Sequence, residues 1–562
     1  MVPPVVNLKY CTKGDIMNNG KIERLGIMLD ASRNAVMKPQ MVKKYIDLIS
    51  KMGYNCLMLY IEDTYEIKGR PYFGLGRGRY TQAELKEIDD YAYKKGIEVI
   101  PCIQCLAHLE RIFRWPEFGK LNDIDNILLV DNEETYKFIG EMIDTVTSCF
   151  RSRVVNIGFD EAMRLGRGKY LDKHGYRDRI DIMSEHLQRI CDMAKERGLE
   201  LLMWGDMYFG TELFTRMCNN KPYDNQELLD ARKNKEKIPE GVSLVYWDYY
   251  STRFEVYDLI METYNYLKPN SWFAGGLWTW TGFAPRNQFS IYTTKLAIEA
   301  CYKNGIKNVV MTMWGDNGSE CSKFNIIPSL FYTAQLAQGI TDETEIKNNF
   351  KQMFGIEFQD FMLLDLKGTQ RDCEDDCCVT SDNYLLYNDV FIGLYDALVP
   401  AGENEKYGAL VPKLQKLVKH SEYGYLFETM TEFCKVMSIK VELGCKTRKA
   451  YLEKDIDALK ALVADYETLP ILIDGFYEAY ERQWMYENKP QGFEVQDIRL
   501  GGLARRIEHC KKMLVKYIEG EIDSIPELEE DRLDPKCRTG EEAGTPIFEI
   551  NWSKIATSSN MG

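Results

Sequence analysis

The chain has 562 residues, too many for one hydrophobic core, so two or three domains are expected. Its net charge of −15 argues against binding to nucleic acid or to anionic membranes. No apolar run reaches the length that spans a bilayer, and residues 1–4 do not begin a basic segment followed by an apolar one, so neither a membrane helix nor a signal peptide is expected.

The 16 cysteines do not form the pattern of a disulfide-bridged secreted protein. The cluster at 373–378 has three cysteines without a CxxC pair or a nearby histidine, which disfavours a zinc site. Free thiols in a reducing cytoplasm are expected, with no metal and no cofactor. Four other cysteines fall inside apolar strand or helix patterns, as small core residues do: Cys56, Cys102, Cys105 and Cys191.

Apolar segments rich in strand-forming residues alternate with helical patterns along the first 340 residues. One of the intervening helices opens with Thr81 and Glu84, the spacing of a capping box. A helix with apolar residues from Leu330 to Leu336 closes the series. The eight predicted strands are 25–30, 56–61, 97–103, 154–159, 199–204, 242–247, 272–277 and 309–314.

This alternation predicts an α/β fold, a (β/α)8 TIM barrel over residues 21–340, preceded by a short segment over 1–20. An open doubly wound sheet is the alternative. It is disfavoured because polar and aromatic residues follow nearly every strand, whereas an open sheet would gather them at one switch point.

Strand signals disappear after residue 340, and helical periodicity dominates to about residue 518. The sequence therefore predicts an all-α C-terminal domain over 341–520, followed by a tail over 521–562 that carries an acidic stretch at 527–531. Helices are expected within it at 381–398, 424–441, 452–484 and 498–517.

In a barrel, the residues that follow each strand meet at one mouth. Here they are rich in carboxylates and tryptophans, which suits a sugar: indole faces stack on its C–H surfaces, and carboxylates bind its hydroxyls. The adjacent pair Asp160 and Glu161 ends the fourth strand. The other expected strand-end residues are Arg33, Glu62, Asp63, His108, Trp204, Trp247, Tyr249, Tyr250, Trp278, Trp280, Trp314 and Asp316.

An ordered set of motifs resembles glycoside hydrolase family 20, the β-N-acetylhexosaminidases. The family has an adjacent Asp-Glu pair after its fourth barrel strand, within a Gly-x-Asp-Glu motif that Gly158-Phe159-Asp160-Glu161 matches. The helical C-terminal region resembles that of a bacterial, exo-acting subgroup. The further matches, over residues 24–320, are Met28-Leu29-Asp30-Ala31-Ser32-Arg33, Gly78-Arg79-Tyr80-Thr81, Ala107-His108, Met203-Trp204 and Met313-Trp314-Gly315-Asp316.

The resemblance implies a retaining, substrate-assisted hydrolysis of terminal β-linked GlcNAc, or GalNAc, from glycans, without a metal. Glu161 is then the proton donor. The substrate's own acetamido oxygen attacks C1 to form an oxazolinium ion, and Asp160 accepts the acetamido N–H and stabilises the charge. Two adjacent residues fit this division of labour, because a direct double displacement needs carboxyls about 5 Å apart across the sugar.

The resemblance also implies a tyrosine that holds the acetamido carbonyl. Tyr249 is the first choice and Tyr250 the second, and spacing does not separate them. In the family this tyrosine usually follows the seventh strand, where this chain has Trp278-Thr279-Trp280.

A second departure lies at the first strand, where the family has an Arg-Gly that binds the sugar's O3 and O4. This chain has Leu25-Gly26, with Arg24 one place early, so Arg33, Glu62 or Asp63 is expected to take over.

The remaining roles follow the resemblance. Trp314 and Asp316 match residues that wall the acetamido pocket and bind O4 and O6, and Trp204 and Trp247 are expected to complete the wall. His108 resembles a histidine that orients the carboxylate at Asp160.

Two alternative functions stay open at this stage. One is a glycan-binding protein that kept the pocket and lost turnover. The other is a retaining glycosidase that uses two separate carboxylates on sugars without an acetamido group. The linkage preference and the natural glycan are not predicted, and a homodimer stays open.

Overall fold

The computed structural model describes residues 21–218, 221, 223–369, 381–420 and 422–533. Eight parallel strands close into a barrel in the order β1-β10-β9-β8-β7-β6-β3-β2. The prediction of a TIM barrel is confirmed, and the open doubly wound sheet is excluded. The strands are β1 (Arg24–Asp30), β2 (Cys56–Tyr60), β3 (Glu98–Cys102), β6 (Val154–Asn156), β7 (Glu200–Trp204), β8 (Val242–Trp247), β9 (Trp272–Gly276) and β10 (Asn308–Met313).

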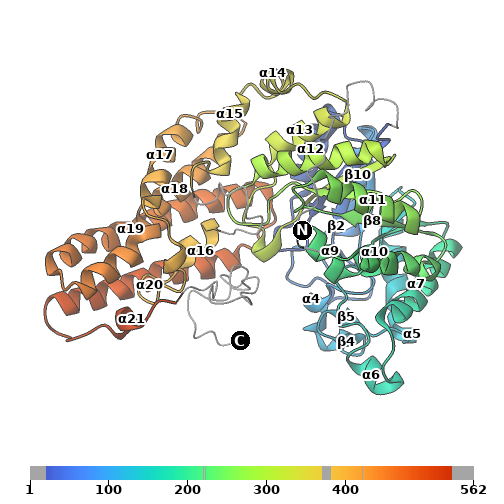
Figure 1. The fold of residues 1–562 in the computed structure, drawn as a ribbon, viewed down its shortest axis with the longest axis horizontal. Helices are drawn as coiled ribbons and strands as arrows, with labels where there is room; N and C mark the ends of the chain where they lie inside the picture. Colours follow the sequence, from blue (N-terminus) through green and yellow to red (C-terminus); the bar gives the residue numbers. More distant parts are fainter. Residues whose placement is uncertain (1–20, 219–220, 222, 370–380, 421, 534–562) are drawn as a thin grey trace.

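Helices surround the barrel, as Figure 1 shows on its right-hand side. Helix α3 starts at the predicted capping box, in which the Thr81 hydroxyl accepts from the Glu84 N–H and the Glu84 carboxylate accepts from the Thr81 N–H. The helices of this part are α2 (Pro39–Met52), α3 (Gln82–Lys94), α4 (Glu110–Phe113), α5 (Glu133–Cys149), α6 (Lys169–His174), α7 (Arg179–Glu196), α8 (Asp206–Phe209), α9 (Thr211–Cys218), α10 (Asn225–Arg232), α11 (Phe254–Leu267), α12 (Asn287–Lys303) and α13 (Ile327–Ala337), with the 3-10 turns η1 (Pro116–Phe118), η2 (Lys233–Lys237) and η3 (Asp316–Gly318).

The barrel interior is packed with side chains rather than open. Alternate residues of each strand point inward, because the side-chain period of a strand is two. Met28 of β1 lies in register with Met58 of β2, and both are fully buried. Towards the carboxyl ends of β7 to β10, the buried cluster becomes aromatic, with Trp204, Trp278 and Trp314 in it. The mouth of the barrel is therefore lined with indole rings.

A small hairpin that the sequence did not signal lies between β3 and α5. Its strands, β4 (Asn122–Ile124) and β5 (Ile127–Leu128), pair antiparallel and are too short to show a clear alternation. The hairpin matters for the site, because Asp125, Asn126 and Ile127 line a surface hollow beside Glu161.

A helical part follows the barrel, as predicted, and its long helices α18, α19 and α20 lie side by side on the left of Figure 1. The boundaries predicted for it, 341–520, and for the tail, 521–562, stay predictions. Its elements are α14 (Glu343–Phe354), α15 (Phe358–Phe361), η4 (Met362–Asp365), α16 (Ser381–Tyr387), η6 (Asp396–Leu398), α17 (Glu403–Gln415), α18 (Gly424–Leu452), α19 (Ile456–Glu487), α20 (Glu494–Ile518) and α21 (Pro526–Glu529).

One predicted helix, at 381–398, is wrong beyond Tyr387. The side chain of Asp389 accepts hydrogen bonds from the backbone N–H groups of Phe391 and Ile392, and Asn388 accepts from that of Tyr395. These side-chain bonds compete with the helix ladder and turn the chain. Helix α17 was not predicted at all.

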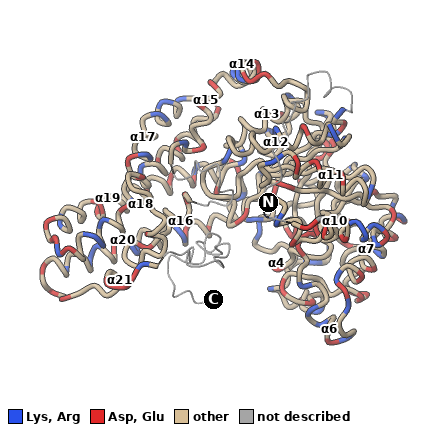
Figure 2. The backbone as a smooth tube through the Cα atoms, in the orientation of Figure 1, with Lys and Arg blue, Asp and Glu red and all other residues tan. Residues whose placement is uncertain are grey.

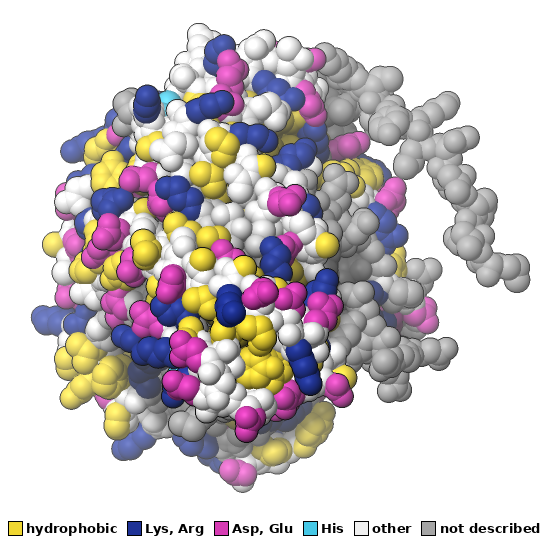
Figure 3. All heavy atoms as spheres, turned by 90° about the vertical axis from the view of Figure 1, so that its left-hand side faces the viewer, with side chains coloured by type: hydrophobic (Ala, Val, Ile, Leu, Met, Phe, Trp, Pro, Cys, Tyr) yellow, Lys and Arg dark blue, Asp and Glu magenta, His cyan; other side chains and the backbone are white. Residues whose placement is uncertain are grey.

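Charges of both signs are interspersed along the helices of both parts (Figure 2). The face of the helical part turned to the viewer in Figure 3 likewise mixes basic and acidic side chains, with hydrophobic ones between them. No helix among the described residues is both long and apolar enough to cross a bilayer. The 11 cysteines that the structure describes are free thiols, ten of them buried, and the cluster at 373–378 lies outside the described residues.

Candidate active site

The turn after β6 carries the adjacent carboxyls on an unusual backbone. Gly158, Phe159 and Glu161 all have positive φ, of 78°, 78° and 53°. Position 158 also needs glycine for space, because a Cβ there would lie 1.9 Å from Oε1 of Gln104. A left-handed Phe and Glu cost conformational energy, which is the kind of strain that functional sites hold.

This backbone sends the two carboxyls into different surroundings. Asp160 is only 8% exposed, whereas the side chain of Glu161 is 52% exposed. Although adjacent in sequence, one therefore faces the protein and the other faces the opening of the mouth.

Asp160 is held on both oxygens. Its Oδ2 lies 3.2 Å from Nε2 of His108, and its Oδ1 accepts a 3.0 Å hydrogen bond from Nε2 of Gln104. Burial alone would raise the pKa of Asp160, but His108 and Gln104, with the charge of Arg33 further off, lower it below its ordinary value. Asp160 is therefore an ionised acceptor at neutral pH.

His108 is the cation of this pair. Burial opposes its protonation, but the charge of Asp160 and the contact with it outweigh burial and raise the pKa of His108 to about 10. The same Nε2 lies 3.6 Å from Oε2 of Glu161. One protonated ring therefore faces both carboxyls, as the predicted orienting role for His108 requires.

Glu161 has the opposite tendency to Asp160. Burial raises its pKa, and the neighbouring charges of Asp160 and Asp316 raise it further, against the opposing effect of His108. Its side chain borders an open hollow of about 490 Å³, whose wall includes Asp125, Ile127 and Met163. A carboxyl whose pKa is raised, beside an open hollow, is suited to protonate a leaving group.

A chain of hydrogen bonds extends from Asp160 to the second strand. The Gln104 amide that donates to Asp160 also donates, at 2.8 Å, to the hydroxyl of Tyr60, and that hydroxyl donates at 2.8 Å to Oε1 of Glu62. Burial raises the pKa of Glu62 to about 7, despite the opposing charge of Arg33. The position of Asp160 is thereby tied to residues of two neighbouring strands.

Arg33 is the centre of the charged wall. Its guanidinium lies 3.5 Å from Asp30, 3.7 Å from Glu62 and 3.7 Å from Asp316. It also lies over the ring of Trp314, at 4.6 Å from the centroid. These contacts place Arg33, Glu62 and Asp316 together at the mouth, as the sequence predicted.

Arg24 is excluded from the mouth. It begins β1, at the opposite end of the barrel from Asp30, and pairs with Glu98 at 3.1 Å. The sequence left open which residue replaces the family's arginine, and the positions favour Arg33.

Asp63 is engaged elsewhere. Its Oδ1 accepts a 3.3 Å hydrogen bond from Nε of Arg77, in the glycine-rich loop that the sequence carries at 74–78. A Cβ on Gly74 would lie 2.0 Å from the Asp63 carbonyl oxygen, so this loop packs directly on the strand end. Asp63 therefore holds the loop in this structure, rather than facing Arg33 as Glu62 does.

The other side of the mouth is aromatic. Trp278 stacks on Trp280 with centroids 4.5 Å apart, and its Nε1 donates to the backbone oxygen of Tyr249 at 3.0 Å. Trp247 stacks on Tyr249 at 5.3 Å, and Trp204 lies 6.1 Å from Trp314. The structure thus brings all seven predicted strand-end aromatics, Tyr250 included, into one packed cluster.

The two candidate tyrosines differ in burial and in their neighbours. The Tyr249 hydroxyl contacts the side chains of Trp314 and Thr312 and senses the charges of Asp160 and Asp316, while burial raises its pKa above the ordinary value. Tyr250 is half-buried and packs edge-on against Trp278. The geometry therefore favours Tyr249 as the residue that reaches the centre of the mouth.

Four polar residues of the site were given no role from the sequence, although Asp30 and Asp206 were expected at strand ends. Asp30, Tyr60 and Gln104 end or follow strands, and that placement was the available signal. Asp206 follows β7; its Oδ2 accepts from the Glu161 N–H at 3.2 Å and its Oδ1 from Nε1 of Trp247 at 3.3 Å. Burial and the charges of Asp160 and Glu161 raise the pKa of Asp206 to about 7.

Two family models match the sequence. Residues 24–222 match the model described as "Glycosyl hydrolase family 20, catalytic domain", and residues 359–545 match "Glycoside Hydrolase 20C C-terminal domain". Together they span more than half of the chain, in the order of the barrel and the helical part.

Curated proteins and a solved structure are also similar to the chain. The chain is 22% identical over 270 residues to Hexosaminidase D of Bos taurus, which covers 46% of this chain and 71% of the bovine protein. It is 23% identical to Hexosaminidase D of Homo sapiens, over 39% of this chain and 43% of the human protein. A crystal structure of beta-N-acetylhexosaminidase from Bacteroides fragilis has a TM-score of 0.43 at 21% identity, over 59% of this chain and 70% of that chain.

Proposed function

Because the chain belongs to glycoside hydrolase family 20, we propose that it is a retaining exo-β-N-acetylhexosaminidase that removes terminal β-linked GlcNAc, or GalNAc, from glycans. Substrate-assisted catalysis is characteristic of this family. The observation that carries the proposal is the contrast between two neighbouring carboxyls: Asp160 is buried, paired and held ionised, and Glu161 is exposed with a raised pKa.

In the first step, Glu161 gives its proton to the glycosidic oxygen while the bond between that oxygen and C1 breaks. The acetamido carbonyl oxygen of the bound sugar attacks C1 from the other face and closes an oxazolinium ring. Asp160 accepts the acetamido N–H and faces the positive charge that develops, which is electrostatic stabilisation in a site already arranged for it. The contacts from His108 and Gln104 support this role by fixing the Asp160 carboxylate.

In the second step, Glu161 acts as a base. It takes a proton from a water molecule that enters from the leaving-group side, and the water oxygen attacks C1 as the ring reopens. The acetamido group is restored, and the configuration at C1 is the same as in the substrate. The open hollow beside Glu161 supports both halves of the reaction, since it offers the leaving group and then the water a route to that carboxyl.

The two walls of the mouth bind different parts of the terminal sugar. Tyr249 donates to the acetamido oxygen, with Trp204, Trp247 and Trp314 around the acetamido methyl and the sugar face. The charged wall, Arg33 with Glu62 and Asp316, binds the hydroxyls at the far end of the sugar.

The test is hydrolysis of 4-nitrophenyl β-GlcNAc, with retention followed by NMR, and inhibition by a GlcNAc-thiazoline that mimics the oxazolinium ring. Turnover and tight inhibition support the proposal. Binding of GlcNAc without turnover would favour the glycan-binding alternative. Turnover of β-glucosides that the thiazoline does not inhibit would favour two separate carboxylates.

The remaining expectations stay predictions: a cytoplasmic location, a homodimer as one oligomeric state, and the domain boundaries. The free thiols of the described part support a reducing compartment.

A further inference from the structure

The loop that carries Asp316 has a backbone that needs support. It follows β10 and contains the turn η3, in which Asn317 has φ 60°, and the next residue but one, Ser319, has φ 59°. Neither is glycine, so each costs energy in the left-handed region unless its neighbours fix it. From the barrel side, Asp30 accepts a 2.8 Å hydrogen bond from the Gly315 N–H.

The other side of this loop is held by the helical part. Nη1 of Arg499, on α20, donates to the backbone oxygen of Asn317 at 2.7 Å and to Oε1 of Glu320 at 2.8 Å. The second oxygen of Glu320 accepts from the side-chain amide of Asn383, on α16. The Glu320 side chain is only 3% exposed and that of Arg499 16%, so these charge-assisted bonds lie largely away from water.

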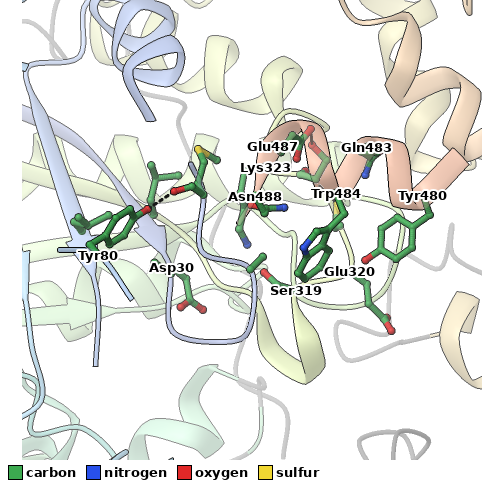
Figure 4. Close-up of a pocket in the computed structure, with 17 residues that line it drawn as sticks. Asp30, Tyr80, Ser319, Glu320, Lys323, Tyr480, Gln483, Trp484, Glu487 and Asn488 are labelled. Atoms are coloured by element: carbon green, nitrogen blue, oxygen red, sulfur yellow. Dashed lines mark hydrogen bonds between the residues drawn. The ribbon is translucent and has the colours of Figure 1, made fainter. Parts of the chain in front are cut away.

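Helix α19 completes the support. Figure 4 shows Ser319 and Glu320 facing Trp484 and Tyr480 of that helix, and these residues line one small internal cavity. Beyond the loop, the Ser322 hydroxyl donates at 2.6 Å to Glu487. The strand-end loop is thus clamped between Asp30 of the barrel and three helices of the C-terminal part.

We propose that Arg499 is a positioning residue for the sugar site: by binding Asn317 and Glu320, it sets where Asp316 stands against Arg33, and so sets recognition of the hydroxyls at the far end of the terminal sugar. This inference rests on the proposed function of Asp316. It gives the helical C-terminal part a role in substrate selection, although Arg499 lies 179 residues after Glu320 in the sequence.

A matched control lies on the same helix. Arg506 binds Asp389 through two hydrogen bonds of 2.6 and 3.2 Å, and the Asp389 side chain is 5% exposed. This pair resembles Arg499 and Glu320 in chemistry and burial, but it lies within the helical part and does not contact the Asp316 loop. Arg506→Met therefore reports what the loss of a buried pair on α20 does by itself.

The experiment compares Arg499→Met, Arg499→Lys and Arg506→Met on 4-nitrophenyl β-GlcNAc and on its 4-epimer, β-GalNAc. Arg499→Met should lower kcat/KM by about tenfold, the scale of a lost charge-assisted hydrogen bond, and should do so more through KM than through kcat. The ratio between the two epimers should change in the same direction as in Asp316→Asn. Arg499→Lys should recover part of the loss, and Arg506→Met should leave both the rate and the ratio unchanged.

A double-mutant cycle separates action through Asp316 from a general effect. In an Asp316→Asn background, Arg499→Met should lower kcat/KM by less than about twofold, because the carboxylate that Arg499 positions is already gone. An equal loss in both backgrounds, or an unchanged epimer ratio, overturns the proposal. If Arg499→Met does not fold, as judged by its Tm, the Arg499→Lys variant enters the same cycle with the same criteria.

Hydrogen exchange keeps this inference distinct from the proposed function. Amide exchange at 315–320 should accelerate in Arg499→Met and not in Arg506→Met, whether or not the enzyme turns over. An inactive wild type with this exchange pattern would refute the proposed activity and leave the clamp standing. Unchanged exchange at 315–320 would refute the clamp in an active enzyme.

Discussion

The two walls of the barrel mouth are built on different principles. The wall from β1, β2, β3 and β6, with Asp316 after β10, is charged: burial and neighbouring charges set the pKa of each carboxyl there, so His108 lowers that of Asp160 while burial raises that of Glu62 against the charge of Arg33. The wall from β7 to β10 is aromatic, and its rings hold one another by stacking and by single hydrogen bonds, such as that from Trp278 to Tyr249. Changes in the charged wall should therefore alter rates and pH profiles, and changes in the aromatic wall should alter binding.

The largest effect is expected at Glu161. Glu161→Gln removes the proton donor, so cleavage of chitobiose should fall by about 10³-fold, within the range that general acid catalysis supplies. A 2,4-dinitrophenyl glycoside needs little protonation and should be cleaved at a rate closer to that of the wild type. Steady-state kinetics on both substrates check this, and intact chitobiose cleavage would remove Glu161 from its role.

Asp160→Asn should lower kcat/KM by about 10²- to 10³-fold on every substrate. The positive charge that Asp160 stabilises develops during ring closure, whatever the leaving group is. It should also change the pH profile. Without Asp160, the buried His108 loses the partner that keeps it protonated. Glu161 then loses the lowering effect of His108 as well as the smaller raising effect of Asp160, so the basic limb of kcat/KM, where Glu161 loses its proton, should move to higher pH. An unchanged basic limb would mean that a different group carries that proton.

The aromatic wall offers a matched pair in Tyr249 and Tyr250. Tyr249→Phe removes the hydroxyl nearest the centre of the mouth and should lower kcat/KM by about 10²-fold, the lower end of the cost of one donor to a developing charge. The ring of Tyr250 packs against Trp278, and Tyr250→Phe should lower kcat/KM by only a small factor. The reverse order would exchange the two roles.

His108→Gln sharpens the contrast through pH rather than through rate. Protonated His108 lowers the pKa of both Asp160 and Glu161, so its loss should raise both. The acidic limb, where Asp160 must be ionised, and the basic limb, where Glu161 must be protonated, should both move to higher pH, with a rate loss of about tenfold at the optimum. A shift of only one limb would contradict the shared contact.

The smallest effect is expected at Trp278. Trp278→Phe removes one buried hydrogen bond, to the backbone oxygen of Tyr249, and should lower stability by about 1 kcal/mol with little change in kcat. Chemical denaturation measures the change in stability, and the 4-nitrophenyl β-GlcNAc assay measures kcat. A large kcat loss would mean that Trp278 contacts substrate directly.

Much of the barrel and of the site follows from local sequence. Strand ends are readable because apolar runs stop at polar residues, and a barrel brings those ends together whatever the intervening loops are. Asp160, Glu161 and Asp316 were found in that way. The hairpin β4–β5 was not, since its strands of three and two residues carry no usable periodicity.

What local sequence does not carry is which distant side chains share a hydrogen bond. Nothing near Gln104 indicates that its amide joins Asp160 to Tyr60, because the three residues come from the ends of three different strands. Arg24 begins the first strand and Arg33 follows it by three residues, and only the direction of β1 separates the bottom of the barrel from its mouth. Arg499, far along a helix, has no pattern that links it to Asn317.

The central claim, that the bound sugar's own acetamido oxygen is the nucleophile, can be measured directly with 4-nitrophenyl β-glycosides whose N-acetyl group carries zero, one, two or three fluorines. Each fluorine makes the carbonyl oxygen less nucleophilic and leaves the leaving group unchanged. A kcat/KM that falls steeply at every step is the predicted result. A kcat/KM that stays level across the series would contradict it, since an enzyme nucleophile would not sense the fluorines in this way.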